Sequence, residues 1–209
     1  MLKKSRHILI YLIVILLSMT VFANENKSKP QITQETAVKK FIEWDKQLNA
    51  LDTFYEQETS FEGTLISKTF GHLIKLGQNI RLETLEEGKI TQYALTDKEI
   101  IHIFSEKGNM IMQMPWESWQ KSQQNKALFD FGNYEKILEN HKIENFEISE
   151  NGYLLVLTPK EGEIYTLSFL LNKHNFFPKE INLSNEGVTS KTTLQKTKIN
   201  KNVSKEIFK

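Results

Sequence analysis

The apolar positions of the chain follow a helical period at first and then change to the period of β-strands. Over residues 34–52 an apolar residue recurs every three or four positions, which predicts one face of an amphipathic helix. Five residues form this stripe: Ala37, Phe41, Trp44, Leu48 and Leu51. From residue 54 onward, short runs rich in β-branched and aromatic residues alternate with turn signals. The sequence therefore predicts a helix followed by a β-rich region.

Eleven strands are expected, in two groups. The first group covers residues 54–66, 71–76, 80–85, 89–96, 99–105 and 110–116, and the second covers 143–149, 153–158, 163–171, 177–184 and 188–199. The breaks are short, as at Phe70-Gly71 and Glu86-Glu87-Gly88, and Asn151-Gly152 is a strong hairpin signal. Turns this short require antiparallel neighbours, because parallel strands need a long crossover. A strongly curled antiparallel sheet or an open barrel is therefore expected.

Residues 117–140 interrupt the strand pattern. Apolar side chains there share a helical face at Ala127, Leu128, Phe131, Tyr134 and Leu138. This spacing predicts one or two short helices, interrupted near Gly132. The helical insertion lies between the two groups of strands.

The N-terminus has the layout of a secretory signal. Lys3, Lys4 and Arg6 form a positive cluster, an apolar run follows over residues 8–22, and the sequence turns polar after Ala23. The alternative is a membrane anchor, but the run is shorter than the roughly 20 residues that a spanning helix needs. We expect cleavage after about Ala23, a flexible start over residues 24–33, and a single domain over 34–209 that carries the insertion at about 117–140.

Charge and cysteine content narrow the function classes. The chain has 27 Lys and Arg against 26 Asp and Glu, and removal of the three basic residues of the signal leaves 24 against 26. Without a basic excess, neither nucleic acid nor an anionic membrane surface is an expected partner. Cysteine is absent, which excludes disulfides, thiolate metal sites and thiol nucleophiles. It also excludes a lipid-modified cysteine at the cleavage site, so the mature protein is expected to be soluble.

The sequence offers little support for catalysis. Four histidines follow the expected cleavage site, and none lies two to four residues from another: His72, His102, His141 and His174. Metal-ligand spacing is therefore missing. The chain has neither a Gly-x-Ser-x-Gly elbow nor a phosphate-binding glycine loop, and its paired carboxylates lie beside turn glycines. We expect neither an enzyme nor a cofactor or metal site.

Apolar side chains are concentrated around the insertion. Met110, Met112 and Met114 alternate along one strand, and Ile101 and Ile103 share a face of its predicted neighbour. Methionine is flexible, so such a row suits a surface that binds variable apolar partners. The alternative interpretation is an ordinary core in which methionine fills gaps.

Arg81 would be the only arginine after signal cleavage. Two interpretations remain open for it. It is either an exposed strand residue or a hydrogen-bonding fork that joins two elements.

Taken in order, these segments resemble the family of periplasmic outer-membrane lipoprotein carriers, LolA. Four stretches carry the resemblance: 95–104 (LTDKEIIHIF), 153–160 (YLLVLTPK), 177–183 (FPKEINL) and 198–208 (KINKNVSKEIF). Each is weak alone, but their shared order and spacing are specific, and the similarity covers nearly the whole chain after the signal.

Two departures from the family pattern exist. Lys98 directly follows Asp97 where the family has Gly, and Gly77-Gln78 stand where the family often has Arg-Pro or Lys-Pro. Arg81 or Lys75 would have to replace that Arg, which helps latch the lid.

The resemblance implies an α+β fold, in which a curled antiparallel sheet forms an incomplete β-barrel with an N-terminal helix and a helical lid. It implies a monomeric periplasmic chaperone that carries the acyl chains of lipoproteins in an apolar cavity from the inner to the outer membrane. The implied partners are acylated lipoproteins, an inner-membrane lipoprotein-releasing ABC transporter, and an outer-membrane lipoprotein receptor or the membrane itself.

The resemblance also implies a set of residues around the acyl chains. The expected wall and lid residues are Leu73, Ile80, Leu82, Ile101, Ile103, Met110, Met112, Met114, Trp116, Trp119, Phe129 and Phe131. Arg81 is the expected lid latch. The alternatives are a periplasmic sensor or interaction module with a fully packed interior, and an anchored receptor of the same system, which the missing cysteine opposes. A hydrolase is the remotest alternative.

Overall fold

The computed structural model describes residues 32–208. The expected signal and its cleavage site lie outside the described residues. All elements below belong to one compact unit, Gln34–Lys209. Among the residues described, no helix is long and apolar enough to span a bilayer.

The elements follow the order predicted from the sequence. The first group is α2 (Gln34–Lys46), β1 (Ala50–Phe61), β2 (Thr64–Leu76), β3 (Asn79–Glu86), β4 (Lys89–Thr96), β5 (Ile100–Ser105) and β6 (Met110–Pro115). The insertion contains α3 (Trp116–Lys121), the 3₁₀ helix η1 (Lys126–Phe129) and α4 (Tyr134–Asn140). The second group is β7 (His141–Ser149), β8 (Gly152–Pro159), β9 (Thr166–Leu171), β10 (Pro178–Asn185), β11 (Val188–Ile199) and the 3₁₀ helix η2 (Lys205–Phe208).

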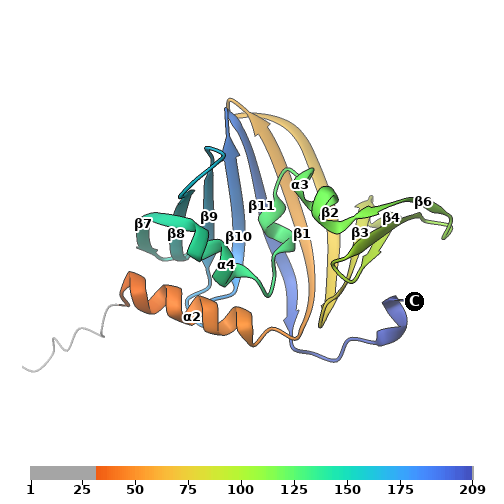
Figure 1. Ribbon diagram of the computed structural model, residues 1–209, viewed down its shortest axis with the longest axis horizontal. Coiled ribbons are helices and arrows are strands. Elements are labelled where there is room, and N and C mark those ends of the chain that lie inside the picture. The colour runs from red at the N-terminus through yellow and green to blue at the C-terminus, as the bar shows by residue number, and fades with distance from the viewer. Residues whose placement is uncertain (1–31, 209) are drawn as a thin grey trace, which may run out of the picture. The chain divides into compact units, whose positions relative to one another are not determined.

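All eleven strands form one antiparallel sheet in the order β6-β5-β4-β3-β2-β1-β11-β10-β9-β8-β7. The sheet curls strongly but does not close, since β6 and β7 remain as its two edges (Figure 1). Helices α2, α3 and α4 lie on the same side of it, which we call the inner face (Figure 1). The predicted fold class, an incomplete antiparallel barrel with helices, is confirmed.

One half of the inner face is filled by aromatic packing. The ring of Phe41 on α2 lies 5.3 Å from Phe169 on β9 and 5.2 Å from Tyr134 on α4. The rings of Phe131 and Tyr134 are 5.4 Å apart. All four side chains are buried. This cluster fixes α2 and the end of the insertion over β8, β9 and β10.

The first helix ends earlier than its apolar stripe predicts. It stops at Lys46, and β1 begins at Ala50, so Leu51 pairs with Lys75 and Ile199 in the sheet. The side-chain amide of Asn200 fixes this change: its oxygen accepts hydrogen bonds from the backbone N–H groups of residues 49 and 50. Leu51 is buried on β1, and it would also be buried on a longer helix. Its apolar character therefore does not distinguish a helix from a strand at this position.

The predicted break at Phe70-Gly71 is wrong, because β2 runs without interruption from Thr64 to Leu76. Gly71 lies opposite Tyr55 on β1, and a β-carbon at Gly71 would collide with the Tyr55 ring at 2.2 Å. The glycine is therefore present to admit a ring across the strand, a recognised role for glycine inside a strand.

Candidate functional site

The other half of the inner face holds a cavity of about 380 Å³. One wall is formed by β1 to β5, and the opposite wall by α3, η1 and the segment that joins them. The lining contains neither Asp, Glu, His, Lys nor Arg, so the cavity is uncharged. Its size lies near the lower end of the range of about 300–1,000 Å³ for small-molecule sites. A cleft of about 540 Å³ between α3 and α4 is larger, but Glu117, Lys121 and Lys136 are among its lining residues.

The strand register places an apolar row at one end of the cavity. Leu82, Ala94 and Ile103 are direct partners across β3, β4 and β5, and all three line the cavity. Trp119 and Phe129 face them from the insertion with ring centres 4.9 Å apart. This end of the cavity is therefore a slot for an apolar group.

The next rows toward the β1–β2 turn are polar. Thr84 pairs with Gln92, and Thr69 pairs with Gln57. All four line the cavity, and each is an uncharged hydrogen-bonding side chain. The cavity thus changes along the strands from an apolar end to an end that can hydrogen-bond a neutral polar group.

Tyr55 belongs to the same row as Thr84, since both residues pair with Gly71. Its ring lies over the backbone of Gly71, and burial raises the pKa of its hydroxyl to about 12. Tyr55 therefore stays neutral at any physiological pH and serves as a wall rather than as an acid or base.

A polar seam at the centre of the sheet bounds the cavity. The side-chain amide of Asn125 donates to the carbonyl of Ile181 at 2.9 Å and to the hydroxyl of Thr192 at 2.8 Å. The Thr59 hydroxyl donates to the neighbouring residue Gln124. Among the described residues, the Oδ1 of Asn125 and the Oγ of Ser190 are buried there without a partner. Such groups cost about 1–3 kcal/mol each, which offsets part of what the hydrogen bonds of the seam contribute.

The far end of the insertion is anchored by charge. The carboxylate of Asp45 on α2 accepts the backbone N–H of Gly132 at 2.7 Å and that of Tyr134 at 2.8 Å. Burial raises the pKa of Asp45, although those two donors and the charges of Lys75 and Lys98 oppose the shift. The Nζ of Lys98 also donates to the carbonyl of residue 131 at 3.3 Å.

Lys75 is the second cation near this anchor. Its ammonium donates to the carbonyl of Gly77 and lies beside Gly132. Burial, together with the charge of Lys98, lowers the pKa of Lys75 to about 8 despite the nearby carboxylate of Asp45. Lys75 and Lys98 are thus two basic side chains that reach this end of the insertion.

The structure distributes the expected acyl-chain residues over three environments. Leu82, Ile103, Trp119 and Phe129 meet at the cavity. A second group is buried in packing and does not line the cavity: Leu73, Ile80, Ile101, Trp116 and Phe131. The three methionines lie on the edge strand β6.

The methionines do not form one continuous row. Met112 pairs with Ile103 and Met114 with Ile101, but a register shift then places Met110 opposite Phe104. An irregularity of this kind changes the alternation of side chains along a strand. Met110 therefore lies outside the row that Met112 and Met114 form with Ile103 and Ile101.

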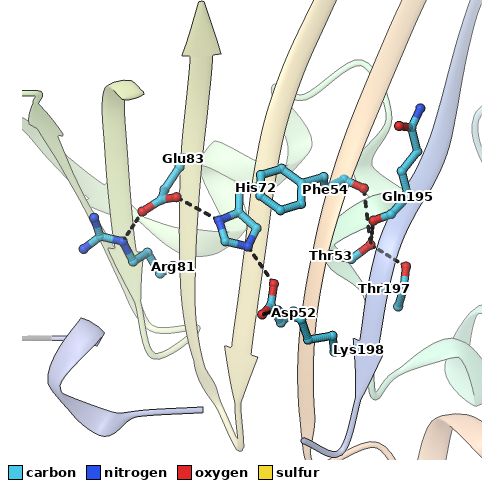
Figure 2. Close-up of polar contacts among 9 residues, drawn as sticks. All are labelled: Asp52, Thr53, Phe54, His72, Arg81, Glu83, Gln195, Thr197 and Lys198. Atoms are coloured by element: carbon cyan, nitrogen blue, oxygen red, sulfur yellow. Dashed lines mark hydrogen bonds and ion pairs between the residues drawn. The ribbon is translucent and has the colours of Figure 1, made fainter. Parts of the chain in front are cut away.

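Arg81 takes part in a network on the outer face (Figure 2). Its Nε donates to Glu83 at 2.7 Å. The ring of His72 lies between two carboxylates, with Nδ1 2.9 Å from Glu83 and Nε2 2.7 Å from Asp52, and Asp52 also pairs with Lys198 at 2.9 Å. Burial opposes a charge on His72, but the two carboxylates outweigh it and raise the pKa of His72.

The remaining contacts of Arg81 point to the C-terminal segment. An Nη group donates to the carbonyl of Ile207 in η2 at 3.1 Å, and the guanidinium lies 4.3 Å from the ring centre of Tyr93. Arg81 alternates with the cavity residue Leu82 along β3, so its side chain points away from the cavity. It joins β3 to η2 as a fork between two elements, and these contacts do not include the insertion.

The polar cavity residues were not anticipated from the sequence. The signal for them lies in the alternation along β1, where Tyr55, Gln57 and Thr59 are uncharged and Glu56 and Glu58 carry charge. Alternation of charged and uncharged polar residues distinguishes a wet outer face from a sheltered inner one. Among the described residues, no group of three His, Cys, Asp or Glu side chains could hold a metal ion.

No protein family matches the sequence of the chain, and no curated protein matches it. Solved structures resemble it. A LolA superfamily protein from Nitrosomonas europaea matches with a TM-score of 0.50 and 11% identity over 86% of this chain and 98% of that one. A conserved protein from Thermus thermophilus matches with a TM-score of 0.52 and 12% identity over 83% and 91% of the two chains. At such identity the likeness is one of fold, and the protein has the LolA-like fold that its sequence motifs predicted.

Proposed function

We propose that the protein is a periplasmic carrier that binds the acyl chains of lipoproteins beneath the insertion and moves them from the inner to the outer membrane. The observation that supports this most is the uncharged cavity between the curled sheet and the insertion. An acyl chain gains about 0.8 kcal/mol for each buried CH₂, so a long chain needs a binding site that is free of charge. A fully packed interior would favour the alternative, a sensor or interaction module. The cavity therefore favours the carrier over that alternative.

The gradation within the cavity suits an amphipathic ligand. The apolar end at Leu82, Ala94 and Ile103 would take the chain, and the polar rows at Thr84 and Gln92 would hydrogen-bond the ester or amide that joins the chain to the peptide. Neutral donors and acceptors match these neutral groups, whereas a charged lining would have to be desolvated on binding. The cavity would therefore bind the linkage as well as the chain.

Loading of more than one chain would require the insertion to move. The seam at Asn125 contains two buried polar atoms without partners, while Asp45 and Lys98 hold the other end by charge-assisted hydrogen bonds. We expect the segment from α3 to η1 to lift and the end near Gly132 to act as the hinge. An inner-membrane ABC transporter would deliver the cargo, and a receptor or the outer membrane would accept it.

A release assay tests this function. The purified protein is added to spheroplasts, and the supernatant is probed for acylated lipoprotein that co-migrates with it. Ile103→Glu places a charge in the cavity and should abolish release. Ile100→Glu, on the same strand but exposed and outside the cavity, is the matched control and should retain release. Absence of any release, alongside an active lipoprotein carrier as the positive control, would reject the proposed function.

A further inference from the structure

The two edges of the sheet are protected to different degrees. β6 and β7 each pair with one strand only, so each presents a row of backbone groups on its free side. On β7, Lys142 forms an ion pair with Glu144, Asn145 donates to Glu147, and the register shifts at residues 143–145. Charged side chains and irregular register are the features by which proteins prevent an edge from pairing with another strand.

Edge strand β6 has none of these charges. Its sequence is Met-Ile-Met-Gln-Met-Pro, and its only register irregularity lies near Met110. The side chains of Met110, Ile111 and Met112 are 55%, 57% and 46% exposed. An uncharged, apolar edge strand is a template for an added strand, because an extended backbone supplies the hydrogen bonds that the edge lacks.

The free edge lies close to the cavity. The row Leu82–Ala94–Ile103 of the cavity wall continues directly to Met112 on β6. Strands are about 4.8 Å apart, so a strand added beyond β6 would lie roughly 10 Å from Ile103. Three or four extended residues, at about 3.3 Å each, cover this distance. A peptide whose lipid occupies the cavity therefore reaches the edge within its first few residues.

We propose that β6 binds the peptide segment next to the lipid-modified residue of the cargo as an added antiparallel or parallel strand. This inference rests on the proposed carrier function and adds a second binding surface to it. The partner is an extended peptide of low charge without proline at the paired positions. Main-chain hydrogen bonds would supply most of the affinity, so lipoproteins with different linker sequences could share one site.

Amide hydrogen exchange tests the proposal with three probes: palmitate, a dipalmitoylated cysteine peptide with a linker of about six uncharged residues, and the same lipopeptide with its linker amides N-methylated. Calorimetry measures binding of each. We expect all three to bind, and only the unmethylated lipopeptide to slow exchange of backbone amides within residues 110–114 by tenfold or more. Binding of that lipopeptide without protection of β6 would overturn the edge pairing and leave the carrier function standing. If neither palmitate nor the lipopeptides bind, both proposals fail.

A pair of variants provides a second test. Ile111→Lys adds a charge to the exposed edge strand β6, and Ile148→Lys makes the same change at an exposed position of the other edge, β7. Ile111→Lys should weaken binding of the unmethylated lipopeptide by about tenfold and leave palmitate binding unchanged. Ile148→Lys should change neither. Equal effects of the two variants would contradict a role specific to β6.

Discussion

The two halves of the inner face are built from the same kind of strand but differ in what covers them. Over β9, the rings of Phe41, Tyr134 and Phe169 pack against one another and are fully buried. Over β1 to β5, the insertion spans the sheet without filling it, and uncharged polar residues such as Gln57 and Thr84 remain on the inner face. The packed half stabilises the fold, while the other half keeps an unfilled space. The following substitutions test this division.

The largest effect is expected at the anchor between the halves. Asp45→Ala removes the acceptor of two backbone N–H groups and takes a nearby carboxylate away from Lys75 and from Lys98, of which Lys98 keeps that of Asp130. Loss of one partner from a buried charged group costs about 3–5 kcal/mol. Urea unfolding should show this loss, and the exposed Glu43→Ala on the same helix should stay within about 0.5 kcal/mol of the parent.

A matched pair of leucines compares the halves directly. Leu157→Ala lies in the packed half, and Leu82→Ala lies at the cavity. The first should cost about 3–5 kcal/mol and the second nearer 2 kcal/mol, because a side chain beside an existing cavity loses fewer contacts. Equal losses in unfolding free energy would argue that the cavity half is packed as tightly as the other.

Gly71→Ala should cost less but should alter the cavity. The added methyl group would displace the ring of Tyr55 from its position over the strand. Overpacking of this type costs about 1–3 kcal/mol. Tyr55→Ala removes the ring, so the double variant Tyr55→Ala, Gly71→Ala should have no clash. If the double variant is less stable than Tyr55→Ala alone, the Tyr55 ring is not the reason for glycine at position 71.

The smallest effect is expected from pH at the outer network. Burial opposes all three charges, but mutual contacts raise the pKa of His72 and lower those of Asp52 and Glu83. The histidine contribution is complete below about pH 6.5 and is lost as pH rises through its raised pKa, whereas the carboxylate contributions are present above about pH 4 and are lost on acidification. Unfolding free energies of the parent should therefore fall from pH 6 to pH 8.5 more than those of His72→Gln. If the unfolding free energies of the parent and of His72→Gln change equally with pH, His72 does not contribute to stability through its charge.

The fold was more predictable than the site, for a physical reason. Short strands with tight turns restrict the topology, so the order of elements and the position of the insertion followed from the sequence. The cavity residues did not, because a Gln or Thr in a strand usually indicates the solvent side. The alternation with Glu56 and Glu58 is a signal for Gln57, whereas only the register shows that Thr69 faces inward. The burial of Lys75 beside the carboxylate of Asp45 was equally invisible, since that carboxylate comes from a distant helix.

The strand order has a consequence for how the chain folds. Strands β1 to β6 form one series of consecutive hairpins and β7 to β11 another, and the two series meet only where β1 pairs with β11, for example at Tyr55 and Leu194. Consecutive hairpins form quickly because their partners are close in sequence, whereas contacts between distant residues must first overcome the entropy of a long loop. We therefore expect two rapidly formed meanders that join in a slow, rate-limiting step along the β1–β11 seam. Substitutions in the paired strands β1 and β11 should slow refolding more than equivalent substitutions inside either meander.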